Sequence, residues 1–159
     1  FVFGLNLAGK TSILKAFQEK PIKDIKPTLN VDISRIRVEN LSMVIYDAPG
    51  QAKLKGLWEP YLHMDLEGLI FVLDILHRMK FEKAKELLHE IANQPELKDL
   101  PLLILFNKAD LIKEPDVSAY AEEMEIYNLK QRPTHYFLTS AKTGEGIEEA
   151  FEWLAREIS

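Results

Sequence analysis

The sequence has no cysteine, no long apolar run and no excess of positive charge. The absence of cysteine excludes disulfides, thiolate metal sites and lipid attachment to a thiol within these 159 residues. The longest apolar runs, Leu69–Leu73 and Leu102–Phe106, are far shorter than the roughly twenty residues that span a bilayer, so we expect buried strands there. A net charge of −5 argues against nucleic acid, or a polybasic membrane anchor, as a partner.

The residues that are present fit one globular domain. Hydrophobic residues make up 47% of the sequence and charged residues 28%, which is typical of a folded chain. We expect a single domain over residues 1–159 with one core. Because Phe1 already belongs to an apolar strand, with no Met or signal region before it, we expect that an amino-terminal segment is missing. The lack of cysteine fits a reducing cytosol, so we expect a cytoplasmic protein.

Short apolar runs alternate with amphipathic patterns along the whole chain, which predicts an α/β fold with a mostly parallel sheet and helices on both faces. Six strands are expected, at Phe1–Phe3, Val31–Val38, Leu41–Tyr46, Leu69–Asp74, Leu102–Phe106 and Tyr136–Thr139. Four helices are expected, at Lys10–Glu19, Phe81–Asn93, Pro115–Tyr127 and Gly146–Ile158.

The pair of strands around Glu39-Asn40 is the exception to the parallel pattern. Two β-rich runs separated by such a short polar turn predict an antiparallel pair at the edge of the sheet. The alternation of apolar and polar residues breaks between Ile33 and Ile36, which predicts a β-bulge in the first of these strands.

The segment Gly4–Thr11 reads GLNLAGKT, which fits the pattern G-x-x-x-x-G-K-[ST] between a strand and a helix. Its glycines let successive backbone N–H groups point at one anion, and the helix that begins near Lys10 adds the positive end of its dipole. The segment resembles the phosphate loop of P-loop proteins, which implies that Lys10 bridges the β- and γ-phosphates and that Thr11 ligates Mg²⁺. The expected phosphate-binding residues of this loop are Asn6, Leu7, Ala8, Gly9, Lys10, Thr11 and Ser12.

A second motif, DAPGQ, follows the third expected strand. In this D-x-x-G-Q arrangement we expect Asp47 to hold Mg²⁺ through water, the Gly50 amide to sense the γ-phosphate, and Gln51 to orient the attacking water. Upstream, Thr28 lies in a polar segment, and we expect it to supply a second hydroxyl to Mg²⁺ only when a triphosphate draws it in. We therefore expect Gln51 and Lys10 to be the catalytic residues, and Thr11, Thr28 and Asp47 to hold the metal.

Two further motifs predict a guanine site. The Asp110 carboxylate of the segment Asn107–Asp110 accepts from both N1–H and N2–H₂ of guanine, a pair that adenine does not offer. Asn107 is expected to brace the phosphate loop, while the Lys108 stem lies along the base. After the sixth expected strand, the Ala141 amide can donate to guanine O6. The expected base-binding residues are Asn107, Lys108, Asp110, Ser140, Ala141 and Lys142.

From the phosphate loop to Leu154 the chain resembles a small GTPase of the ADP-ribosylation-factor (Arf) family. The residues that carry the resemblance are GLNLAGKTSIL, the PT before a long strand pair, DAPGQ leading into LWEPY, GLIFVLD, LLILFNKADL and the closing FEWL. The resemblance implies a Ras-like G domain that cycles between GDP and GTP states with Mg²⁺. It also implies a role in vesicle trafficking or membrane-associated signalling, with peripheral attachment through an amino-terminal helix.

Effectors of Arf-like proteins read an aromatic cluster near the switch regions. The matching positions are Val31, Tyr46 and Tyr61, with Leu57 and Trp58 beside them. We expect these five residues to contact an effector, exchange factor or GTPase-activating protein. Ile25 stands where Gα subunits carry a catalytic arginine, so intrinsic hydrolysis is expected to be slow and to depend on an activating partner.

The chain departs from the family pattern at Asn6, Asn30 and Pro49, and its SAK triplet is more Ras-like. A proline before the switch glycine also occurs in some Rag-type GTPases, so a Rag-like heterodimer subunit is one alternative. A non-hydrolysing GTP-binding scaffold is another, although intact Thr28 and Gln51 count against it. A nucleotide kinase or ATPase would need a different base site from the one that Asn107–Asp110 predicts.

Overall fold

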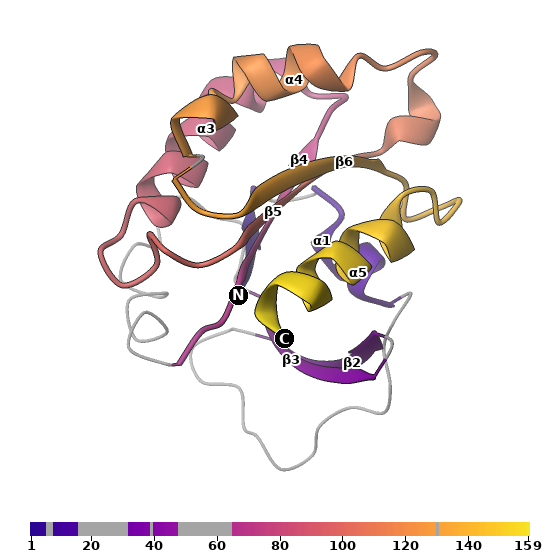
Figure 1. The fold of residues 1–159 in the computed structure, drawn as a ribbon. Helices are drawn as coiled ribbons and strands as arrows, with labels where there is room; N and C mark the ends of the chain where they lie inside the picture. The colour runs from indigo at the N-terminus through magenta and orange to yellow at the C-terminus, as the bar shows by residue number, and fades with distance from the viewer. Residues whose placement is uncertain (6–7, 16–31, 39, 48–64, 130) are drawn as a thin grey trace.

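The computed structural model describes residues 1–5, 8–15, 32–38, 40–47, 65–129 and 131–159. Within them, six strands form one sheet in the order β2-β3-β1-β4-β5-β6 (Figure 1). Their bounds are β1 Val2–Gly4, β2 Asp32–Val38, β3 Leu41–Asp47, β4 Leu69–Asp74, β5 Leu102–Asn107 and β6 Thr134–Thr139. Only β2 runs antiparallel to its neighbour in this described sheet. The predicted sheet, with one antiparallel edge strand, is confirmed.

Helices cover both faces of the sheet, with α3 and α4 on one side and α1 and α5 on the other (Figure 1). The helices are α1 Lys10–Lys15, α3 Phe81–Ala92, α4 Val117–Glu123 and α5 Ile147–Ile158, and the 3-10 helices are η1 Arg78–Lys80, η2 Ala109–Leu111 and η3 Ile126–Leu129. The last residues of the first predicted helix, 16–19, lie outside the described residues. Within the described ranges, no helix combines the length and apolar character needed to cross a membrane.

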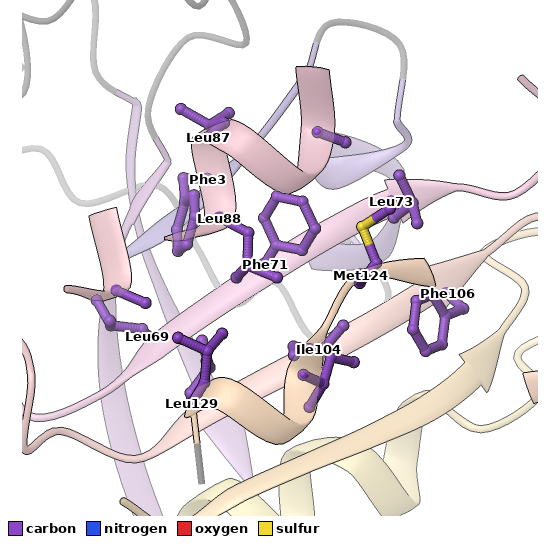
Figure 2. Close-up of a cluster of buried hydrophobic side chains, with 14 of the residues drawn as sticks. Phe3, Leu69, Phe71, Leu73, Leu87, Leu88, Ile104, Phe106, Met124 and Leu129 are labelled. Atoms are coloured by element: carbon purple, nitrogen blue, oxygen red, sulfur yellow. The ribbon is translucent and has the colours of Figure 1, made fainter. Parts of the chain in front are cut away.

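The central strands are buried on both faces because their alternate residues join two cores, one on each face of the sheet, in place of the single core expected from the sequence. Phe71 and Ile104 pack under α3 and α4, in the cluster shown in Figure 2. Val72 and Leu105 point to the other side and pack with Phe151 of α5. A strand covered on both faces is apolar at every position, which is why β4 and β5 read as continuous apolar runs in the sequence.

The bulge predicted in β2 is wrong. The β2–β3 register runs without interruption from the pair Asp32–Asp47 to the pair Val38–Leu41. Ile36 is buried in the core that contains α5. Ile33 lies on the opposite face, opposite Tyr46, which packs against the other core. The break in alternation therefore marks a strand with Ile36 and Val38 on one face and Ile33 on the other, and the ladder stays regular.

The helix predicted at Pro115–Tyr127 is shorter and is followed by a separate turn. Asp116 caps α4, because its carboxylate accepts a hydrogen bond from the Ala119 backbone N–H at 3.2 Å. The chain then leaves the helix through Glu125, whose φ is 51°. Met124 and Ile126 are both buried, yet a continuous helix would place them on nearly opposite sides. The positive φ at Glu125 lets both side chains reach the same core.

Arg132 is a buried cation that ties the loop before β6 to the end of α3. Its exposed fraction is 4%. Its guanidinium donates to the Leu97 carbonyl at 3.1 Å and to the carbonyl of Ala92, the last residue of α3. Burial lowers the pKa of Arg132 from its ordinary value, and the charge of Asp99 opposes that shift. The negative end of the helix dipole offers the cation a favourable place.

We expect Arg132→Ala to lower the free energy of unfolding by about 2–4 kcal/mol, because two buried carbonyls lose their donor. Urea denaturation followed by circular dichroism measures the change. The matched control is Arg78→Ala, since Arg78 pairs with Glu123 at the surface and its side chain is 60% exposed. That control should cost less than about 1 kcal/mol. Equal costs for the two variants would contradict the structural role of Arg132.

Candidate functional site

A row of polar residues closes the carboxyl ends of three neighbouring strands. The register pairs Asp74 of β4 with Asn107 of β5, and Asn107 with Thr139 of β6. Asp74 and Asn107 each follow a buried apolar run, and Thr139 is the buried last residue of β6. In open α/β sheets ligands bind beyond the carboxyl ends of the strands, which makes this edge the candidate site.

The phosphate-loop motif begins at this same edge, where Gly4 ends β1. A side chain at Gly4 would place its Cβ 2.4 Å from the Val72 carbonyl oxygen, so the close approach of β1 to β4 requires glycine. Lys10 opens α1 and is almost entirely buried. Its ammonium donates to the carbonyls of Gly4 and Leu5, each at 3.3 Å, which holds the charge inside the loop.

The Asn107 side chain joins this loop to the sheet. Its Nδ2 donates to the Ala8 carbonyl at 2.9 Å, and its Oδ1 accepts from the Thr139 hydroxyl at 3.2 Å. Gly9 has a φ of 97°, and a Cβ there would lie 2.2 Å from Asn107 Nδ2. The loop can therefore approach the buried amide only if position 9 is glycine.

The loop after β6 supports Asp110 from the other side. The Ser140 hydroxyl donates to Asp110 Oδ1 at 2.7 Å, and its oxygen accepts from the Thr143 backbone N–H at 3.1 Å. The Gly144 N–H donates to the Ser140 carbonyl at 2.8 Å, which closes the loop into a tight turn. The carboxylate of Asp110 is thereby held at the pocket described below.

Lys108 is fixed at both its backbone and its ammonium. Its φ of 70° places the backbone in the left-handed region, which is uncommon for a residue other than glycine. Its Nζ lies 2.8 Å from Asp74 Oδ2. This contact links the residues that follow β5 to the end of β4.

These segments enclose a pocket of about 430 Å³. Such a volume falls in the range of small-molecule sites. The pocket is lined by Gly9, Ser12, Asn107, Lys108, Asp110, Leu111, Ala141 and Lys142. The structure thus brings together residues of both the phosphate motif and the base motif, which are distant in sequence. Their roles as ligands stay predictions.

The other expected site residues cannot be placed in the same way. Of Thr11 and Asp47 the structure describes only the backbone, in α1 and at the end of β3. Tyr46 is half-buried and packs against the core under α3 and α4. The expected residues outside the described part of the chain are Asn6, Leu7, Thr28, Val31, Gly50, Gln51, Leu57, Trp58 and Tyr61.

Three residues of this edge were not predicted from the sequence as site residues. Asp74 pairs with Lys108, Thr139 binds the Asn107 amide, and Leu111 lines the pocket. The sequence did contain a signal for Asp74, because this residue directly follows an apolar run, as Asn107 does. Its partner could not be seen, because Asp74 and Lys108 become neighbours only through the sheet register.

Comparison with known proteins identifies relatives of this chain. The model of the ADP-ribosylation factor family matches residues 1–158. Among solved structures, the chain is similar to the Arl6 BBS3 small GTPase from Trypanosoma brucei with bound nucleotide analogue GppNp, with a TM-score of 0.82. The sequences are 24% identical, and the match covers 98% of this chain and 94% of that chain. This likeness confirms the predicted Ras-like fold.

We expect Gly9→Ala to lower the free energy of unfolding by about 2–5 kcal/mol, because the new Cβ meets the buried Asn107 amide at a strained φ. Gly144→Ala is the matched control, since Gly144 also has a positive φ of 85° but its Cβ would meet nothing within 4 Å. That variant should cost about 1–2 kcal/mol, from backbone strain alone. Urea denaturation measures both. Similar costs for the two would show that the Asn107 contact adds nothing.

Proposed function

Since this chain belongs to the ADP-ribosylation factor family of small GTPases, we propose that it binds GDP and GTP with Mg²⁺ and hydrolyses GTP slowly by itself. The observation that carries the proposal is that Gly9, Asn107, Asp110 and Ala141 line the same pocket. The glycine belongs to the phosphate motif, and the other three belong to the base motifs. One ligand with a guanine base at one end and phosphates at the other accounts for this arrangement.

The base would be selected by Asp110. Its Oδ1 already accepts from the Ser140 hydroxyl, and a carboxylate has lone pairs for further donors. The N1–H and N2–H₂ groups of guanine supply two donors on one edge, whereas the same edge of adenine presents an acceptor at N1. A site that holds a carboxylate in this position disfavours adenine because the carboxylate would lose a partner on binding.

The phosphates would meet the Lys10 ammonium. A buried ammonium is costly unless it is paired with an opposite charge or donates hydrogen bonds to several acceptors. The carbonyls of Gly4 and Leu5 are two of the groups that Lys10 contacts. The β- and γ-phosphates would supply full negative charge at the same place, which supports a role for Lys10 in both binding and hydrolysis.

Mg²⁺ would be held by the Thr11 and Thr28 hydroxyls and, through water, by Asp47. Hard oxygen ligands of this kind suit Mg²⁺. Thr11 follows Lys10 in the first turn of α1, and Asp47 is the last residue of β3, paired in the sheet register with Val2 of β1. The bound ion would neutralise negative charge on the phosphates. Gln51 would orient the attacking water.

Regulation would come from partner proteins. Ile25 supplies no cationic group to the transition state, so an activating protein would contribute an arginine worth roughly 10³ to 10⁵ in rate. Effectors and exchange factors would contact Val31, Tyr46, Leu57, Trp58 and Tyr61. We place this switch in vesicle trafficking or membrane-associated signalling, in the cytoplasm and at membrane surfaces, because the family resemblance implies it.

The test is to identify the nucleotide that copurifies with the protein by mass spectrometry, and then to follow single-turnover GTP hydrolysis with Mg²⁺. We expect bound guanine nucleotide and slow hydrolysis, and we expect Gln51→Leu to bind GTP without hydrolysing it because no side chain orients the water. GTP that stays intact for days on the wild-type protein would favour the scaffold alternative. Equal hydrolysis by Gln51→Leu would remove Gln51 from the mechanism.

We expect Asp110→Asn to lower the affinity for GDP by about 10²- to 10⁴-fold, because two charge-assisted hydrogen bonds are lost. The asparagine amide can still accept from Ser140 and can donate to the O2 of xanthine, so binding of xanthosine diphosphate should rise. Equilibrium titration with GDP and with xanthosine diphosphate measures how the relative affinity for the two nucleotides changes. Asp116→Asn makes the same chemical change at the cap of α4 and should alter neither affinity. An unchanged preference in Asp110→Asn would place the base elsewhere.

A further inference from the structure

Asp74 is a buried carboxylate that contacts a pocket residue without lining the pocket itself. Its side chain is 8% exposed at the end of β4. Its Oδ1 accepts from the Leu76 backbone N–H at 2.9 Å. Its Oδ2 lies 2.8 Å from Lys108 Nζ and 3.5 Å from His77 Nε2. The pocket is lined by Lys108 but not, among the described residues, by Asp74.

This contact restrains a side chain that is otherwise among the most mobile. A lysine stem has several rotatable bonds and loses entropy when it is ordered. At Lys108 the backbone is fixed in the left-handed region, and the ammonium is held by a carboxylate on the neighbouring strand. With both ends fixed, the methylene groups between them have little freedom, and Lys108 is one of the residues that line the pocket.

We propose that Asp74 is a positioning residue for the nucleotide base and that it acts through Lys108. The ion pair holds the Lys108 stem along the wall of the pocket before the base enters, so that binding does not have to order it. This inference rests on the proposed binding of guanine nucleotide. A purely structural role, in which Asp74 only caps the turn at Leu76, makes a different prediction for the variants below.

The test measures the dissociation rate of radiolabelled GDP from the whole protein in the presence of Mg²⁺. Asp74→Asn keeps an oxygen that can accept from the Leu76 N–H but removes the ion pair. We expect it to raise the dissociation rate about three- to tenfold, the effect of freeing one side chain. Lys108→Met keeps an apolar stem without the ammonium, and we expect it to raise the rate by at least the same factor.

The double variant Asp74→Asn/Lys108→Met separates the two roles. If Asp74 acts through Lys108, adding Asp74→Asn to Lys108→Met should change the rate no further. If the two factors multiply, or if Asp74→Asn alone dissociates at the wild-type rate, the inference is overturned. His77→Gln is the control, because it removes the more distant contact with the same oxygen and should leave the rate unchanged.

Circular dichroism first establishes that each variant is folded. If Asp74→Asn is not folded, Asp74→Ser takes its place, and a wild-type rate in that variant or in Lys108→Met overturns the inference. Failure of the proposed function would look different. In that case the wild-type protein would not bind GDP at all, whereas failure of this inference leaves GDP bound with a rate that does not depend on Asp74.

Discussion

The buried side chain of Asn107 joins three segments that lie far apart in the sequence. Its amide donates to the loop at Ala8 and accepts from Thr139 on the next strand. A side-chain amide buried at this depth is stable only when its hydrogen-bonding groups are matched, so each partner must be in place for the others to hold. The shape of the phosphate loop, the glycine at position 9 and the position of the pocket all depend on this contact.

The sheet and the loops contribute different parts of the site around Asn107. The register of β4, β5 and β6 places Asp74, Asn107 and Thr139 side by side. The loops that follow contribute the groups that line the pocket. Asp74 and Asn107 are anchored in β4 and β5, which are buried on both faces, so the centre of the row rests on closely packed strands.

The sequence was sufficient to predict the sheet, because the buried strands β4 and β5 produce continuous apolar runs and each motif follows a predicted strand. The sequence was not sufficient where the backbone conformation or the strand register decides where a helix ends or which face a residue lies on. The chain leaves α4 through the positive φ of Glu125, which the periodicity of the sequence does not reveal. Ile33 broke the expected alternation because it lies on the other face of the strand from Ile36. Asp74 was overlooked for the same reason, since its partner Lys108 is a neighbour only in three dimensions.

The hydrogen bond between Asn107 and Ala8 spans 99 positions along the chain, and Thr139, which completes it, lies further still. A nascent chain leaving the ribosome therefore carries its phosphate motif long before it carries the groups that hold that motif in shape. Parallel strands need long crossovers and form only when distant segments meet, so this edge of the sheet is completed late in folding. Any ligand of the pocket would consequently bind only after β6 has been synthesised, and binding would report that this strand is in place.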